Sequence, residues 1–204
     1  MPLVDMIEFA GTFAFAISGI RLAAAKEFDW FGAFVVGFVT AIGGGTTRDL
    51  LLDVTPFWMQ NPVYLLCTGI ALITVIIFKQ RLVRLNTPFF IFDTIGLALF
   101  VVAGIEKTVE LSYPFWVVTI MGTITGVVGG IIRDVFINEI PLIFRKEFYA
   151  LACIIGGIVY SVCYKFQCNS LICELLTVFV ILAVRILAVK YQWGLPKLKE
   201  NDVR

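Results

Sequence analysis

The chain of 204 residues contains no histidine and little charge. The absence of histidine removes the commonest general base, the commonest metal ligand and every Ser-His or Cys-His nucleophile pair. Only 15% of the residues are charged, against about 25% in an ordinary soluble domain. Hydrophobic residues make up 60% of the chain and fall in long runs. These features exclude a water-soluble enzyme, a coiled coil and a disordered chain. They indicate a polytopic membrane protein without a tightly bound metal or a cofactor.

An excess of charge of either sign is also lacking. The 16 basic and 15 acidic residues nearly cancel, and no long basic cluster offers a surface for nucleic acid. The five cysteines form no CxxC pair and lack the spacing of a zinc site. Most of them lie in apolar runs, where cysteine behaves as a small hydrophobic residue. Cys168 and Cys173 fall in one short loop, and the sequence leaves open whether they pair.

Seven apolar stretches are long enough, or nearly so, to cross a membrane as helices, which takes roughly 20 residues. They cover residues 5–24, 30–46, 62–78, 88–105, 115–132, 148–164 and 171–189. The connections between them are short and hold most of the charge and proline. We therefore predict an all-α fold with seven transmembrane helices.

The second half of the chain matches the first without a gap at one constant offset, called the repeat shift. The repeat shift aligns Gly44-Gly45-Thr46-Thr47-Arg48-Asp49 with Gly129-Gly130-Ile131-Ile132-Arg133-Asp134. It also aligns Pro56 with Pro141 and Tyr64 with Tyr149. Chance similarity between apolar helices would align leucines and valines, but not glycines, an Arg-Asp pair and a proline at one constant offset. The chain therefore contains an internal duplication.

Each repeat holds three predicted helices, and an odd number reverses the direction of the chain across the membrane. The two halves are then inserted upside down relative to each other, as in many transporters. The predicted fold class is an all-α polytopic membrane protein with two inverted three-helix repeats and one extra C-terminal helix. The expected units are residues 5–84, residues 88–165, a seventh helix at 171–190 and a cytoplasmic tail at 191–204.

The basic residues predict the orientation, because cytoplasmic loops carry an excess of Lys and Arg. Eleven basic residues lie on the side of the first, third and fifth loops and the C-terminus, and only Lys107 and Lys165 lie on the opposite side. Arg48, Arg133 and Arg185 are left out of this count because they are expected inside the membrane. We expect a multi-pass protein of the cell inner (plasma) membrane, with the N-terminus outside and the C-terminus in the cytoplasm.

Consecutive glycines interrupt the second and fifth predicted helices, at Gly43, Gly44 and Gly45 and at Gly129 and Gly130. Each glycine costs about 1 kcal/mol relative to alanine within a helix. A helix that kinks or unwinds there would free backbone carbonyls, which are suitable ligands for a dehydrated alkali cation. Matched breaks in both halves predict a permeation or binding site. The alternative is that small residues at this spacing let two helices approach closely.

An Arg-Asp pair follows the glycines in each repeat, and charge inside a membrane is costly unless it is paired or hydrated. Adjacent helical side chains do not face each other. We therefore expect pairs across the repeats, Arg48 with Asp134 or Arg133 with Asp49. The alternative is that both pairs extend to the two membrane interfaces as anchors.

Other polar positions are expected to matter less. Glu8 and Asp93, which the repeat shift also aligns, are predicted to act as interface anchors. The candidate pore-lining hydroxyls are Ser18, Thr40, Thr46, Thr47 and Thr125. Threonine inside a helix often bonds its own backbone instead.

The doubled motif resembles a known family. Two three-helix repeats with Gly-Gly-Gly-Thr-Thr-Arg-Asp at 43–49 and Gly-Gly-Ile-Ile-Arg-Asp at 129–134, plus a lone seventh helix, are similar to the prokaryotic trimeric intracellular cation (TRIC) channels. The same bacterial proteins are also labelled a glycine-transporter-like family. The resemblance covers about residues 5–190. It implies a homotrimer among membrane lipids, with a pore in each subunit lined by kinked second and fifth helices and passing mainly potassium. Val128 stands where the first repeat has Gly43, so the two kinks are expected to differ.

The function that these features favour is a monovalent cation channel that passes K+ (or Na+), and not an enzyme. Carbonyls freed at the glycines would replace part of the ion's hydration shell. Arg48 and Arg133, held by Asp49 and Asp134, would serve as structural or gating charges. Because arginine binds carboxylates in a bidentate manner, an alternating-access transporter of a small amino acid such as glycine is the alternative.

The orientation can be tested with cysteine reporters. Reporters in residues 106–114 should be labelled from outside the cell by an impermeant maleimide, and reporters in residues 79–87 only from the cytoplasmic side, because basic loops stay in the cytoplasm. Labelling of intact cells is compared with labelling of inverted membrane vesicles. The reverse pattern would contradict the orientation and leave the inverted repeat standing.

Overall fold

The computed structural model describes residues 3–78, 86–145 and 148–194, with only the backbone at 3–4 and 86–88. Every regular element in these ranges is helical, so the all-α fold class is confirmed. The elements are α1 (Leu3–Ala25), α2 (Trp30–Leu51), the 3-10 turn η1 (Phe57–Met59), α3 (Val63–Ile77), α5 (Asn86–Glu110), α6 (Phe115–Phe136), the single turn α7 (Leu142–Arg145), α8 (Tyr149–Lys165) and α9 (Ser170–Lys190). The last ten residues of the predicted tail, 195–204, and residues 79–85 between the predicted repeats lie outside the described ranges.

Most of the long helices can cross a membrane. The five that are long and apolar enough are Asp5–Ala25, Trp30–Leu51, Phe89–Glu110, Phe115–Phe136 and Ser170–Lys190. Val63–Ile77 and Tyr149–Lys165 are apolar but shorter. At the helical rise, α3 is about 22 Å long, less than the roughly 30 Å of a hydrocarbon core. Large apolar side chains such as Leu66 of α3 and Phe179 of α9 face outward, which suits a lipid environment.

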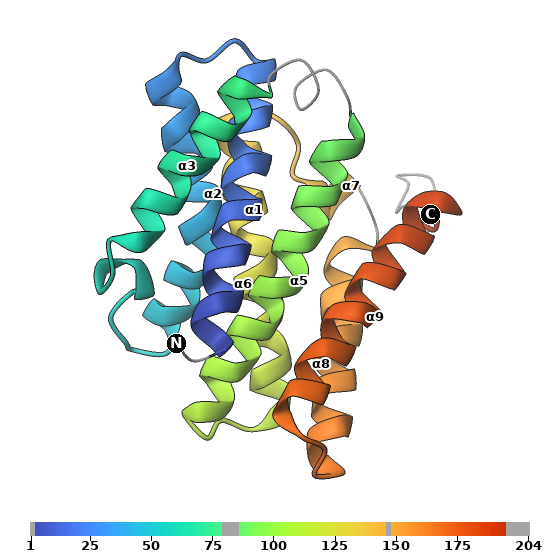
Figure 1. The fold of residues 1–204 in the computed structure, drawn as a ribbon. Helices are drawn as coiled ribbons and strands as arrows, with labels where there is room; N and C mark the ends of the chain where they lie inside the picture. The colour runs from blue at the N-terminus through green and yellow to red at the C-terminus, as the bar shows by residue number, and fades with distance from the viewer. Residues whose placement is uncertain (1–2, 79–85, 146–147, 195–204) are drawn as a thin grey trace, which may run out of the picture.

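Four helices, α1, α2, α5 and α6, form the centre of the bundle (Figure 1). α1 packs against α2, α3 and α5, and α6 packs against α2, α5 and α8. α3 lies on one flank, whereas α8 and α9 lie together on the other (Figure 1). Each long helix of the second half runs opposite to its counterpart in the first, α5 to α1, α6 to α2 and α8 to α3 (Figure 1).

α2 and α6 are both longer than the stretches predicted for them. α2 continues to Leu51 rather than ending at residue 46, and α6 continues to Phe136 rather than ending at residue 132. Both Arg-Asp pairs therefore lie within the last turns of these helices, not in the connections that follow them.

A pair of phenylalanines marks the centre of the core. Phe15 of α1 and Phe100 of α5 are fully buried, and their ring centroids lie 5.3 Å apart. Gly96 lies against the ring of Phe15, and Gly11 lies against the ring of Phe100. The repeat shift relates the two phenylalanines to each other and the two glycines to each other. Each half of the chain thus leaves room on its first helix for the aromatic ring of the other half.

α2 and α6 meet in the same reciprocal way. A methyl group on Gly44 would overlap the carbonyl oxygen of Thr125, and a methyl group on Gly129 would overlap that of Thr40. Both helices are continuous through these positions, and no glycine in the described ranges has a positive φ. The helices therefore do not unwind at their glycines, whereas a kink within a continuous helix stays a prediction. The missing side chains let the two backbones touch.

The close approach predicts the effect of adding a methyl group. Gly44→Ala and Gly129→Ala should each lower the free energy of unfolding by about 1–3 kcal/mol, because overpacking at a backbone contact forces the helices apart. Gly69→Ala in α3 is the matched control, since nothing lies within 4 Å of the added carbon. Thermal midpoints in detergent, read by size-exclusion chromatography after heating, measure the effect. Wild-type midpoints for Gly44→Ala and Gly129→Ala would contradict the packing interpretation.

Candidate functional site

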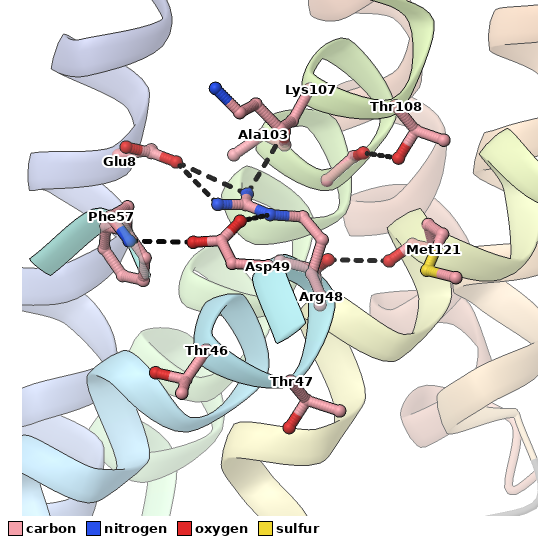
Figure 2. A network of polar contacts seen from close by, with 12 residues as sticks. Glu8, Thr46, Thr47, Arg48, Asp49, Phe57, Ala103, Lys107, Thr108 and Met121 are labelled. Carbon is pink, nitrogen blue, oxygen red and sulfur yellow. Dashed lines mark hydrogen bonds and ion pairs between the residues drawn. The ribbon is translucent and has the colours of Figure 1, made fainter. Parts of the chain in front are cut away.

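Arg48 lies buried near the end of α2 among oxygen atoms from several segments (Figure 2). Its Nε donates to Asp49 Oδ1 at 2.7 Å, and its two terminal nitrogens lie 3.4 Å from Glu8 Oε1. One of them also lies 3.4 Å from the backbone oxygen of Ala103. Tyr64 of α3 donates its hydroxyl to Glu8 Oε2 at 2.7 Å. Glu8, Arg48, Asp49 and Tyr64 are called the first cluster.

Arg133 lies buried near the end of α6 in a matching set of partners. Its Nε donates to Asp134 Oδ1 at 2.8 Å. Its NH1 donates to Asp93 Oδ1 at 2.5 Å and to Ser18 Oγ at 2.8 Å. Tyr149 donates to Asp93 at 3.5 Å. Asp93, Arg133, Asp134 and Tyr149 form the second cluster, and the repeat shift places the first cluster on it position for position.

Each aspartate of the Arg-Asp pairs also holds the segment that follows its helix. Asp49 Oδ2 accepts the backbone N–H of Phe57 at 2.8 Å, and Asp134 Oδ2 accepts that of Leu142 at 2.9 Å. The carboxylate therefore satisfies a backbone donor as well as the guanidinium. Because each aspartate binds both the arginine and a backbone N–H group, the helix can continue through a pair of charged residues.

The two clusters differ because α9 reaches only the second. Arg185 of α9 is 3% exposed, and its NH2 lies 3.7 Å from Asp93 Oδ2. Its guanidinium also lies 4.7 Å from the centroid of the Tyr149 ring, within cation–π distance. With every acid and base ionised, the second cluster and Arg185 carry two charges of each sign. The first cluster carries two carboxylates and one guanidinium, so its formal charge is negative.

A cavity lies at each end of the α1–α5 pair. The larger, of about 650 Å3, reaches Asp93, Asp134 and Arg185 from the end where α1 finishes and α5 begins. The smaller, of about 370 Å3, reaches Glu8, Arg48 and Asp49 from the opposite end. The two cavities share no lining residue. The α2–α6 crossing and the stacked phenylalanines lie between them.

Salt bridges cross the mouth of the larger cavity. Lys26, in the connection after α1, donates to Glu139 Oε1 at 2.7 Å, and Arg145 NH2 lies 3.2 Å from Glu139 Oε2. The hydrogen bond and charge of Lys26, with a smaller contribution from Arg145, hold the pKa of Glu139 below its usual range. Glu139 is therefore ionised at neutral pH, and the connection after α6 is linked electrostatically to the connection after α1.

The pairing predicted across the repeats is wrong. Each arginine binds its own neighbouring aspartate, because Nε is the guanidinium nitrogen nearest the backbone and can turn back along the helix. The terminal nitrogens then reach a carboxylate on the first helix of the same half, Glu8 for Arg48 and Asp93 for Arg133. Both carboxylates are buried, so their predicted role as interface anchors is also wrong. The repeat shift aligns the two carboxylates with each other as well as the two arginines. This alignment was the feature of the sequence that could have identified the carboxylates as partners of the arginines.

The predicted pore-lining threonines bond their own helices. Thr40 donates to Val36 O and Thr125 donates to Met121 O, both at 2.6 Å. Thr46 and Thr47 donate in the same manner to carbonyls one turn earlier. These hydroxyls therefore offer their oxygen lone pairs, not their hydrogens, to other groups. Ser18 differs, because its oxygen accepts a hydrogen bond from Arg133.

Neither metal ligation nor a disulfide is present in the described ranges. No group of three His, Cys, Asp or Glu side chains there could hold a metal ion. All five cysteines lie in those ranges, and all are free thiols. The contacts within the two clusters are ion pairs and hydrogen bonds.

Comparison of the sequence with known proteins gives relatives that cover nearly the whole chain. A family model described as glycine transporter matches the chain twice, over residues 5–80 and 90–165. The chain is 41% identical to the UPF0126 inner membrane protein YadS of Escherichia coli K12, over 98% of this chain and 99% of that protein. It is also 41% identical to a UPF0126 membrane protein of Vibrio cholerae, over 95% of this chain and 82% of the other.

Comparison of the structure finds TRIC channels. A solved TRIC cation channel is 34% identical and superposes with a TM-score of 0.86, covering 98% of both chains. The TRIC channel orthologue of Rhodobacter sphaeroides is 27% identical with a TM-score of 0.89, covering 95% of this chain and all of the other. A channel of C. elegans at 13% identity shares the fold, with a TM-score of 0.60. The resemblance inferred from the doubled motif is confirmed, and so is the inference that the chain is not an enzyme.

A double-mutant cycle tests the contact between α9 and the second cluster. Asp93→Asn and Arg185→Gln should each destabilise the protein, because each leaves a buried charge without its counter-charge. The double variant removes one charge of each sign, so its loss should be smaller than the sum of the two single losses, by about 1–3 kcal/mol. Unfolding in mixed micelles measures all four proteins. Strict additivity would show that the two side chains do not interact.

The same assay gives a control on the pairing across repeats. Combining Arg48→Asp with Asp134→Arg should rescue neither single variant, because the two side chains belong to different clusters. Rescue by this exchange would instead support the pairing across the repeats that helix geometry alone predicts.

Proposed function

The chain belongs to the glycine transporter family, and from its likeness to the solved TRIC channels we propose that it is a monovalent cation channel, passing mainly K+. The observation that carries this proposal is a pair of cavities that enter the bundle from opposite ends, one reaching the end of α2 at Asp49 and the other the end of α6 at Asp134. The crossing of α2 and α6 at Gly44 and Gly129 lies between these two helix ends. A transient separation at that crossing joins them into a path within a single subunit.

The smaller cavity has the charge expected of a cation entrance. Its lining includes four acidic residues against two basic ones, namely Asp5, Glu8, Asp49 and Glu110 against Arg48 and Lys107. A vestibule with a net negative charge raises the local concentration of cations. Arg48 does not repel them, because two carboxylates surround its guanidinium.

The crossing of α2 and α6 is the gate in this proposal. When the helices part at Gly44 and Gly129, the carbonyl oxygens of Thr40 and Thr125 are exposed to the path. Backbone carbonyls are the groups that replace the hydration shell of K+ in selective pores. The neighbouring Gly43, Gly45 and Gly130 carry no side chains of their own and lie against Ile132, Phe57 and Tyr149.

The arrangement of the chain in the membrane follows the same proposal. Six transmembrane helices form two inverted units, residues 5–84 and 88–165, followed by a seventh helix at 171–190 and a cytoplasmic tail at 191–204. The antiparallel directions of the two halves (Figure 1) and the double match of the family model support this division. The subunit assembles as a homotrimer among lipids of the inner membrane, with the N-terminus outside, and conduction needs no cofactor.

A second function is favoured by the larger cavity and by the description of the family model. Arg185 offers a guanidinium for a carboxylate, while Asp93 and Asp134 offer carboxylates for an ammonium group. These are the two charges of a free amino acid. An alternating-access transporter of a small amino acid such as glycine is therefore the alternative to the channel.

Reconstitution into lipid bilayers separates the two functions. A channel gives unitary K+ currents whose reversal potential follows the K+ gradient. A transporter gives saturable counterflow of labelled glycine and no unitary currents. Currents that are absent at all voltages, together with glycine counterflow, would overturn the channel proposal.

The acidic vestibule predicts a salt-dependent conductance. Replacing Asp5 by Asn and Glu110 by Gln should lower the unitary K+ current about two- to fivefold at about 10 mM salt, where the Debye length is about 30 Å. At about 1 M salt the currents of variant and wild type should agree, because the vestibule charges are then screened. Glu27→Gln, an exposed residue outside both cavities, is the control. An equal loss at both salt concentrations would point to a structural effect.

A further inference from the structure

Two buried glutamates face each other where α5, α8 and α9 meet, at the end of the bundle opposite Arg185. Glu106 of α5 is 9% exposed, and its Oε1 accepts the hydroxyl of Tyr160 of α8 at 2.5 Å. Glu174 of α9 is 5% exposed, and its Oε1 accepts the hydroxyl of Ser170 at 2.8 Å. Ser170 and Glu174 both lie close enough to Glu106 to influence its carboxyl group. The serine hydroxyl is therefore placed near both carboxyl groups.

Positive charge is missing from this contact. Within the described ranges, neither Glu106 nor Glu174 has a Lys or Arg at salt-bridge distance, although salt bridges hold the carboxylates of both clusters. The titratable groups that face Glu106 are acidic or neutral, namely Glu110 on its own helix, Tyr160 of α8, and Cys173 and Glu174 of α9. Glu174 Oε2 is buried and accepts no hydrogen bond within the part of the chain that the structure describes. Two ionised carboxylates in such a place would repel each other without compensation.

We propose that Glu106, Ser170 and Glu174 form a proton-binding site that holds one proton between the two carboxyl groups. Protonated Glu106 donates to Ser170 Oγ, and the Ser170 hydroxyl donates to ionised Glu174. Tyr160 donates to the remaining oxygen of Glu106. Every donor in this set of hydrogen bonds then has an acceptor, and the pair carries a single negative charge.

The geometry favours a proton over a metal ion. Ca2+ takes six to eight oxygen ligands and Mg2+ takes six in a strict octahedron, whereas this contact offers two carboxyl groups and two hydroxyls. No third acidic side chain in the described ranges completes a metal-binding group here.

The bound proton docks the first half of α9 against α5 and α8. Losing it leaves two like charges in contact and pushes α9 away from α5. Arg185 lies eleven residues further along α9, about 16 Å in helical rise, where it holds Asp93. The proton site and the second cluster therefore fasten the two ends of one helix.

The folded protein should bind one more proton here than the unfolded chain, whose glutamates ionise near pH 4.3. Stability is then fully present at low pH and is lost as the pH rises. The ratio of folded to unfolded protein should fall by about tenfold per pH unit until the site releases its proton. The proposal does not depend on conduction, because both of its tests are made on the protein at equilibrium.

Infrared spectroscopy detects the proton directly. The wild-type protein in detergent at about pH 7 should show the C=O stretch of a protonated carboxyl group. Glu106→Gln and Glu174→Gln, from two different helices, should each remove that band. Glu110→Gln is the matched control, since its side chain is largely exposed and one turn further along α5. A spectrum unchanged by both variants would overturn the proposal.

Thermal midpoints give the second test. The wild-type midpoint should fall between about pH 6 and about pH 9, and the fall should be absent in Glu106→Gln, because an amide needs no proton. The Glu110→Gln midpoint should fall as the wild type does. Identical profiles in all three proteins would overturn the proposal. So would a midpoint that rises with K+ or Ca2+ at fixed pH while the infrared band is absent, since this would mark a cation site.

Discussion

A guanidinium buried in an apolar bundle must be surrounded by carboxylates, and most of the central structure serves this requirement. Without a counter-charge, an arginine inside the membrane costs several kcal/mol. Arg48 and Arg133 meet the requirement with one carboxylate from the next residue and one from the first helix of the same half. The carboxylates in turn hold backbone donors of the following segments, so that α1, the end of α2 and η1 are fixed around one charge. The same holds for α5, α6 and α7 around the other.

The repeat made the core positions predictable from sequence, but the partners of each charged side chain could not be predicted in this way. The repeat shift identifies Gly44 with Gly129 and Arg48 with Arg133, and these pairs lie at the crossing and in the clusters. The shift could not say whether the glycines unwind a helix or let two helices touch, because both require the same missing side chain. Nor could it choose among carboxylates, since an arginine is long enough to reach several. Glu8 and Asp93 were visible in the alignment, but their burial depends on how α1 and α5 pack together.

The seventh helix breaks the equivalence of the two halves. Arg185 has no counterpart in the first half, so sequence comparison within the chain offers no guide to its place. It neutralises the second cluster, while the first cluster keeps an excess of negative charge. Two ends of a bundle built from the same motif therefore present different electrostatic surfaces. The seventh helix thus makes the two ends of a duplicated chain electrostatically different, whereas the two ends of a symmetric pore would be the same.

The reciprocal contacts between the halves have a consequence for biosynthesis. Arg48 and Arg133 each find one carboxylate on a helix that is already synthesised and the other at the next residue of the chain. Each half can therefore enter the bilayer with its guanidinium compensated. The surfaces at Gly44 and Gly11 are covered only by residues of the second half, Thr125 and Phe100, which are synthesised later. The charges are compensated within each half, as soon as that half is synthesised. The close packing involves both halves and forms only after the second half is synthesised. The nascent first half thus leaves the ribosome with its guanidinium compensated but with an uncovered face that only the second half can fill.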